Sequence, residues 1–255
     1  MTAHSHDRLV ESQFSAQAAA YVTSAVHAGG EDLLDLVARL RDRPAARVLD
    51  LGCGAGHVSF HLAPHVAEVV AYDLSPAMLA VVEGEAARRG LANIATRQGP
   101  VEYLPFDSGA FDVVVSRYSA HHWSDLAAAL SEARRVLRPS GCAIFVDVVA
   151  PSAPLLDTHM QTMELLRDPS HLRNYQPEEW RQGLQAAGFQ PGPAAFRRLR
   201  LDFASWVGRM GTPPLMVEAI RALQARMPAE VLRHFAVEAD GSFTLDTMTI
   251  AAQPV

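Results

Sequence analysis

Three glycines at alternate positions form the part of this sequence best suited to bind a ligand. Gly52, Gly54 and Gly56 follow a short apolar run, and Asp50 precedes them by two residues. Because glycine has no Cβ, such a loop adopts positive φ and brings backbone amides against a ligand. A dinucleotide fingerprint needs its third glycine where His57 stands, and no Lys-Ser/Thr pair of a P-loop follows. The spacing therefore favours a nucleoside over a pyrophosphate.

A carboxylate ends the next apolar run. Asp73 follows Asp50 by 23 residues and closes Val-Val-Ala-Tyr-Asp. A carboxylate at this place accepts hydrogen bonds from both hydroxyls of a ribose. The alternative is that Asp73 caps the helix expected after it, but Ser75, directly before Pro76, suits that role better. We interpret Asp73 as a ribose ligand.

Alternating strands and helices must position these residues. The pattern predicts strands at 47–51, 66–73, 93–98, 111–116, 142–149, 195–203 and 242–252, and helices at 56–63, 76–90, 126–137 and 177–187. Signals for turns and helices are mixed over 151–175, and 204–235 is largely helical. This order is typical of an α/β fold in which helices cover both faces of a doubly wound sheet of seven strands.

Composition and charge indicate which kinds of partner this protein binds. The 255 residues carry a formal net charge of −6 with a pI near 6.0, which disfavours a nucleic-acid partner. No apolar stretch is long enough for a membrane span, and the first residues do not resemble a leader, so we expect a cytoplasmic protein without stable membrane association. Cys53 and Cys142 have no metal or redox spacing, and no metal site is predicted.

Five segments together carry a family resemblance: Asp50-Leu-Gly-Cys-Gly-Ala-Gly56, Ala71-Tyr-Asp-Leu-Ser75, Leu104-Pro-Phe106, Phe111-Asp-Val-Val-Val-Ser116 and Glu132-Ala-Arg-Arg-Val-Leu-Arg-Pro139. In this order and spacing they resemble class I methyltransferases that use S-adenosylmethionine. The chain is similar to the branch that contains the ubiquinone and menaquinone C-methyltransferases. The resemblance covers about residues 45–150 well.

The resemblance implies a Rossmann-like sheet, mostly parallel with an antiparallel last strand, plus a helical cap. It divides the chain into a helical segment 1–44 that covers the site, a cofactor-binding core 45–150, and a part 151–255 with a cap insertion at about 204–235. The implied cofactor is S-adenosyl-L-methionine. Its implied contacts are Asp50, Gly52, Cys53, Gly54, Gly56, Asp73, Leu74, Val101, Glu102 and Arg117.

The expected adenine contact departs from the family pattern. Relatives carry an acidic or amide side chain directly after the glycine that ends the third strand, where this chain has Pro100. Proline offers no side-chain acceptor. The backbone amide of Val101 remains as a donor to the ring. Glu102 or Gln98 could substitute as the acceptor, and the equally open alternative is that Glu102 is only a solvated surface residue.

Three side chains are candidates for catalysis: His121, Asp147 and Tyr21. His121 follows the fourth predicted strand and titrates near neutrality, which suits a general base. Asp147 ends the fifth strand, and Tyr21 lies on an N-terminal helix that in similar enzymes folds over the cofactor. For the neighbouring His122 we favour a role as a packed anchor of the loop.

The sequence thus predicts an S-adenosylmethionine-dependent methyltransferase acting on a small molecule at carbon, oxygen or nitrogen. Motifs for methylation of nucleic-acid bases are absent: there is no Asn/Asp-Pro-Pro-Tyr/Phe and no Pro-Cys. Two alternatives stay open. A regulatory protein could bind the cofactor without catalysis, and an NAD-dependent dehydrogenase would use the same type of sheet, although no Tyr-x-x-x-Lys pair is present. The acceptor atom and the oligomeric state stay open as well.

Overall fold

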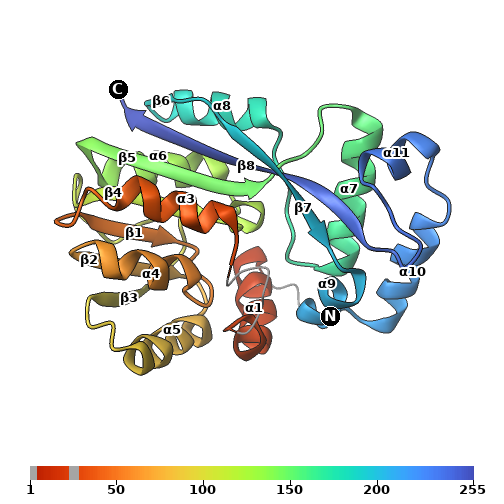
Figure 1. The fold of residues 1–255 in the computed structure, drawn as a ribbon, viewed down its shortest axis with the longest axis horizontal. Helices are drawn as coiled ribbons and strands as arrows, with labels where there is room; N and C mark the ends of the chain where they lie inside the picture. Colours follow the sequence, from red (N-terminus) through yellow and green to blue (C-terminus); the bar gives the residue numbers. More distant parts are fainter. Residues whose placement is uncertain (1–4, 23–28) are drawn as a thin grey trace.

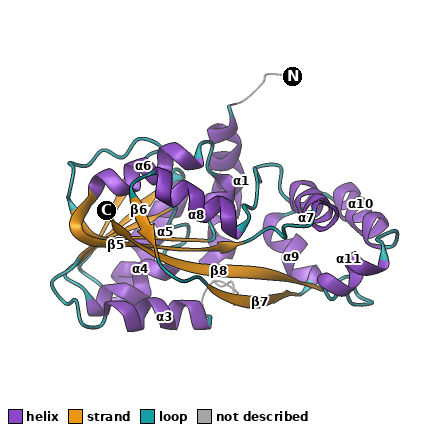
Figure 2. Cartoon of the chain, turned by 90° about the horizontal axis from the view of Figure 1, so that it is seen from above, coloured by secondary structure: helices purple, strands orange, loops and turns teal. Residues whose placement is uncertain are grey.

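The computed structural model describes residues 5–22 and 29–255, with side chains described for 5–15 and 29–255. Within these residues the chain forms one eight-stranded sheet with helices on both faces (Figures 1 and 2). The strands are β1 Arg47–Leu51, β2 Glu68–Asp73, β3 Ile94–Gln98, β4 Phe111–Arg117, β5 Leu137–Val148, β6 Phe189–Pro191, β7 Ala195–Leu201 and β8 Phe243–Pro254. Their order is β3-β2-β1-β4-β5-β8-β6, with β7 also paired to β8.

The first five strands are mutually parallel, and β8 runs antiparallel to β5, β6 and β7. The predicted doubly wound, mostly parallel sheet is therefore confirmed. The predicted number of seven strands is wrong because β6, only three residues long, is too short to show a periodic pattern. The fifth strand also starts earlier than predicted, at Leu137, where it pairs with Phe111 before the register shifts.

Helices α3 Glu31–Leu40, α4 His57–Leu62 and α5 Pro76–Arg89 pack on one face of the sheet. Helices α6 Leu126–Val136 and α8 Pro177–Ala186 pack on the other, where Trp180 is buried in the core. Two short 3-10 helices, η1 Ala63–His65 and η2 Ala120–His122, follow α4 and β4.

Helix α5 illustrates how local sequence sets an element beside the site. Ser75 is its N-cap and accepts a hydrogen bond from the Met78 amide, and Pro76 occupies the first turn. Gly90 ends the helix in the left-handed conformation, with φ of 69°. This start places the carboxylate of Asp73, at the end of β2, directly before a fixed helix terminus.

A cap stands at the far end of the sheet, where β7 and β8 extend beyond the parallel strands (Figure 1). It consists of α7 Pro154–Arg167, α9 Phe203–Met210, α10 Pro214–Gln224 and α11 Ala229–His234. The cap has its own apolar core, in which the largest side chains are Phe203, Trp206, Phe235 and Phe243. Sequence signals over 151–175 were mixed, so α7 was not predicted.

Helix α1 His6–Val22 lies between the parallel strands and the cap (Figure 1). Polar contacts hold it on both sides. Gln13 Nε2 donates to the Met210 carbonyl on α9 at 2.9 Å, and the hydroxyls of Ser15 and Ser75 are 2.9 Å apart. Among the described residues, no helix has the length and apolar character needed to cross a membrane.

Candidate functional site

A cavity opens at the carboxyl ends of β1, β2 and β4, where ligands bind in open α/β sheets. The parallel strands, α1 and the cap line one cavity that is partly open to solvent.

The glycines of the loop differ in what lies close to their backbone. Gly52 has φ of 64°, and a Cβ there would lie 1.8 Å from Ser119 Oγ, so the absence of a side chain lets β4's loop pack against it. Gly54 has φ of 50°, and a Cβ there would meet no described atom within 4 Å. Both residues line the cavity. Gly54 thus offers bare backbone to a ligand.

Gly56 lies outside the cavity lining, and its predicted contact with the cofactor stays a prediction. It is the N-cap of α4 in the left-handed conformation, and a Cβ there would lie 2.9 Å from both Phe60 and Val82. Its smallness serves the packing of α4 against α5, because the chain has already turned away from the cavity.

Asp50 lies beneath the loop with only 1% exposure. Its Oδ2 accepts hydrogen bonds from the Ser59 amide at 3.1 Å and the Ser59 hydroxyl at 2.6 Å. Burial is the largest influence and raises the pKa of Asp50 to about 7, although the bonds from Ser59 oppose this shift. A bound cation would favour the ionised form of this carboxyl group.

Asp73 connects the glycine loop to α5. Its Oδ2 accepts from the Gly54 amide at 2.8 Å and its Oδ1 from the Ser75 amide at 2.9 Å. Burial raises the pKa of this carboxyl group. Asp73 lines the cavity beside Leu74. Ser75 is the N-cap of α5, as the sequence suggested.

The side of the cavity where the sequence predicted the adenine contact is lined by Leu74, Pro100, Val101 and Glu102. Glu102 Oε1 accepts from the Asp125 amide at 3.1 Å, which leaves its second oxygen for another donor. The other proposed substitute, Gln98, is outside the lining and donates to the Leu74 carbonyl. Of the two substitutes only Glu102 is therefore in reach of a ligand.

His121 lines the cavity from η2 and is held by Asp147 at the end of β5. Its Nδ1 is 2.8 Å from Asp147 Oδ1. Burial opposes protonation of the imidazole, but the charge and hydrogen bond of Asp147, with smaller contributions from Glu164 and Asp168, outweigh it and raise the pKa of His121. No described residue forms a hydrogen bond with Nε2, which leaves that nitrogen for a ligand.

Asp147, the second predicted catalytic residue, is not in the cavity lining, and its catalytic role stays a prediction. The carboxylate is 3% exposed, and it accepts from the amides of Ala120 at 2.9 Å and Val148 at 2.8 Å as well as from His121. These contacts with Ala120 and His121 join the end of β5 to η2. Asp147 is thus a positioning residue.

Three further predicted residues have different outcomes. Cys53 and Arg117 line the cavity, and the guanidinium of Arg117 forms an ion pair with Asp32 on α3. Tyr21 lies in α1, but its side chain is outside the described residues. Its catalytic role stays a prediction.

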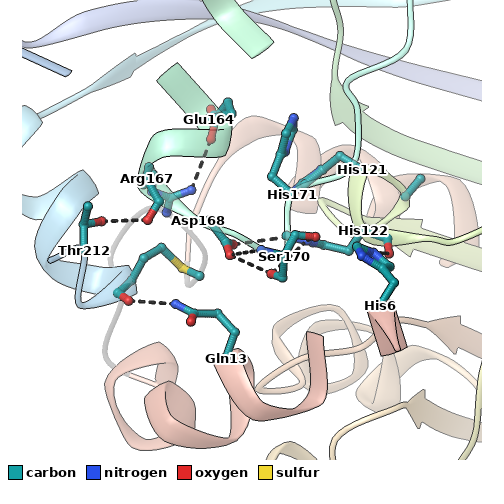
Figure 3. Close-up of polar contacts among 12 residues, drawn as sticks. His6, Gln13, His121, His122, Glu164, Arg167, Asp168, Ser170, His171 and Thr212 are labelled. Carbon is teal, nitrogen blue, oxygen red and sulfur yellow. Dashed lines mark hydrogen bonds and ion pairs between the residues drawn. The ribbon is translucent and has the colours of Figure 1, made fainter. Parts of the chain in front are cut away.

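His122 also lines the cavity and is not only an anchor of the loop. Its Nδ1 lies 2.9 Å from the Ser170 carbonyl oxygen, and its Nε2 lies 4.0 Å from Asp168 Oδ2. Burial, and next the proximity of His121, lower the pKa of His122 to about 4. Figure 3 shows both rings between η2 and the turn that follows α7. Among the described residues no cluster of His, Cys, Asp and Glu is suited to hold a metal ion.

The sequence missed the half of the cavity that the cap supplies. We define the acceptor half as the lining contributed by residues beyond Asp147. Its polar members are Glu164, Arg167, Asp168, Asn174 and Arg209, and its apolar members are Val148, Leu199, Leu201, Trp206 and Leu245. The only local signal was the Asp168-Pro-Ser turn. The members come from the end of β5, from α7 and the segment after it, and from β7, α9 and β8, which only the tertiary structure brings together.

Comparisons with known proteins agree with this geometry. The family model described as "Methyltransferase domain" matches residues 49–145. Over 208 residues the chain is 37% identical to YcgJ of Bacillus subtilis, described as an uncharacterized methyltransferase, covering 80% of each chain. The chain therefore belongs to the methyltransferase family.

Particular relatives show how far the likeness extends. The uncharacterized protein YafE of Escherichia coli is 47% identical over 201 residues, which are 79% of this chain and 97% of YafE. The crystal structure of Bacillus subtilis YcgJ superposes with a TM-score of 0.84 at 32% identity, covering 89% of this chain and all of that one. A demethylmenaquinone methyltransferase of Chlorobaculum tepidum is 37% identical, but over only 41% of this chain and 42% of its own length.

Proposed function

We propose that the protein transfers a methyl group from S-adenosylmethionine to a small molecule, with the donor on the glycine loop and the acceptor in the cap. The observation that carries this proposal is one continuous cavity that joins Gly54 and Asp73 to the free Nε2 of His121. The methyl group of S-adenosylmethionine is already activated by the sulfonium. Aligning the acceptor with it in a pocket that excludes water therefore supplies much of the catalysis.

The residues on the donor side fit this cofactor. A Cβ at Gly54 would project into space in which no described atom lies within 4 Å, so this backbone is open to a ligand. The methionine portion would lie there, the ribose hydroxyls would meet Asp73, and the adenine would lie against Leu74 and Val101. The carboxyl group of Asp50, whose pKa is about 7, would complement the positive charge of the donor. The bound cofactor would supply an activated methyl group.

His121 would act as the general base. Its Nδ1 proton is donated to Asp147, so in the neutral ring Nε2 is the nitrogen that carries the lone pair. Proton transfer from a positioned acceptor group to such a nitrogen contributes about 10²–10⁴-fold in typical enzymes. Trp206 and the leucines of the acceptor half would exclude water and hold the apolar part of the acceptor.

The three parts expected from the sequence would divide this work. Residues 45–150 would bind the donor, residues 151–255 would form the acceptor half, and α1, within 1–44, would cover both. For the curated relatives whose names state an acceptor, such as the demethylmenaquinone methyltransferases, the sequence match covers between 41% and 56% of this chain. A small-molecule acceptor is therefore proposed without adopting theirs.

Thermal-shift measurements test the donor assignment. S-adenosylhomocysteine should raise the melting temperature at concentrations where NAD does not, because only a ligand of the native state stabilises it. A preference for NAD would favour the dehydrogenase alternative. Incubation with donor labelled in its methyl group and a panel of phenols, quinols and amines then separates an enzyme from a regulatory protein, since only the enzyme transfers label.

A further inference from the structure

We infer that the acceptor presents two hydroxyl groups on adjacent carbon atoms, as a catechol or an enediol does, and that His121 and His122 accept one hydrogen from each. This inference rests on the proposed function and names its class of acceptor. The ring centroids of the two histidines are 4.3 Å apart, and both side chains line the cavity (Figure 3).

Hydrogen bonds fix the tautomer of both rings. A carboxylate or carbonyl oxygen only accepts, so Nδ1 of His121 donates to Asp147, and Nδ1 of His122 donates to Ser170. In the neutral rings each Nε2 then carries a lone pair. Neither Nε2 forms a hydrogen bond with the part of the chain that the structure describes, and the side chains are 16% and 10% exposed. The cavity therefore contains two neighbouring acceptors that lack donors.

The segment after α7 holds this pair from behind. The amides of Leu172 and Arg173 donate to the His121 carbonyl at 2.8 and 3.3 Å, and the Ser170 carbonyl accepts from His122. Asp168 fixes the turn, because its Oδ1 accepts from the Ser170 amide and hydroxyl. Backbone contacts thus hold both histidines in place before a ligand binds, and Nε2 of His122 lies 4.0 Å from Asp168 Oδ2.

The environments of the two histidines separate their roles. Asp147 favours the protonated form of His121, while burial and the neighbouring ring keep His122 neutral. Pairs of titratable groups with diverging pKa values are typical of acid and base assignments in active sites. His121 is the group that takes a proton, and His122 orients the second hydroxyl as a neutral acceptor.

Charge balance favours hydroxyls over an ammonium group as the hydrogen-bond donors of the acceptor molecule. The charged side chains of the acceptor half are Arg167 and Arg209 against Glu164 and Asp168, two of each sign. Arg167 is ion-paired with Glu164 at 3.3 Å. A neutral acceptor adds no uncompensated charge to this partly apolar space, whereas burying an ionised ammonium is costly.

The methyl transfer needs only the acceptor, the donor and His121. The hydroxyl proton moves to His121 Nε2, and the hydroxyl oxygen forms a bond to the methyl carbon. The bond between that carbon and the donor sulfur breaks, and its electron pair stays on sulfur. The products are a monomethyl ether, the neutral thioether of the donor and an imidazolium paired with Asp147. The second hydroxyl keeps its proton and donates a hydrogen bond to His122 Nε2.

Calorimetric titration with three probes tests this inference in the presence of S-adenosylhomocysteine. Catechol has adjacent hydroxyls, guaiacol has one of them methylated, and resorcinol has them one carbon farther apart. Catechol should bind at least about tenfold more tightly than the other two, the effect of one good hydrogen bond. Equal binding of catechol and guaiacol, or binding of none of them, would overturn the inference. Binding of S-adenosylhomocysteine alone reports on the proposed function separately.

A variant pair attributes the preference to His122. In His122→Phe a ring remains but the acceptor is lost, so catechol should bind only as tightly as guaiacol. His159→Phe is the matched control, because His159 Nδ1 also lies within hydrogen-bond distance of a carbonyl oxygen, that of Leu155, but on an exposed part of α7. It should keep the preference. Loss in both variants or in neither would contradict the inference, and the wild-type ranking decides if His122→Phe does not fold.

Discussion

Replacing Gly54 by alanine separates backbone strain from ligand binding at the glycine loop. A Cβ at Gly54 would meet no described atom within 4 Å, and φ is 50°. The left-handed conformation costs a residue with a Cβ roughly 1–2 kcal/mol. Gly90, which ends α5, is a matched control: its φ is 69°, and its surroundings within the described residues are equally open. Both variants should lose about 1–2 kcal/mol of unfolding free energy in urea titrations.

Only one of the two variants should lose the cofactor. A ligand carbon in contact with the Gly54 backbone lies about 3.5–4.0 Å away, so an added methyl group overlaps it. Relieving an overlap of this size typically costs about 1–3 kcal/mol, which weakens binding by about tenfold or more. Calorimetry with S-adenosylhomocysteine should show this loss for Gly54→Ala and wild-type affinity for Gly90→Ala. If Gly54→Ala bound as tightly as Gly90→Ala, the glycine loop would not be the cofactor cradle.

Three further predictions follow from the site and the cap. Asp147→Asn should lower methyl transfer by about 10²-fold or more and move the rising limb of the pH–rate profile to lower pH, because Asp147 raises the pKa of His121; an unmoved limb would exclude His121 as the base. The wild type should lose up to about 4 kcal/mol of unfolding free energy as pH rises from about 4 to 7, because the pKa of Asp50 is raised to about 7 in the folded state. Asp50→Asn has no carboxyl group to ionise, so it should not show this loss. Parallel pH profiles of the two proteins in urea titrations would contradict this. Trp206→Ala should lose about 3–5 kcal/mol of unfolding free energy, since the ring is 1% exposed and packs edge-on against Phe243, and a loss below about 1 kcal/mol would show that the cap is not a packed core.

Local sequence determined the donor side of this protein. The positions of Gly54 and Asp73 were predictable because parallel strands end at one edge of the sheet, and a short loop leaves each residue close to the strand that precedes it. The capping residues of α5 likewise act within one helical turn. Even here the role of Gly56 was decided by packing, since Phe60 and Val82 occupy the space that a side chain would need.

Tertiary structure alone decided the acceptor side. His121 was recognisable as a titratable residue after a strand, but its partner Asp147 is 26 residues away, and only the pairing of β4 with β5 places the carboxylate behind the ring. The free Nε2 of His122 depends on Ser170, 48 residues farther along the chain. Contacts between residues so far apart leave no periodic signal in the sequence, because each depends on how the cap packs against the sheet.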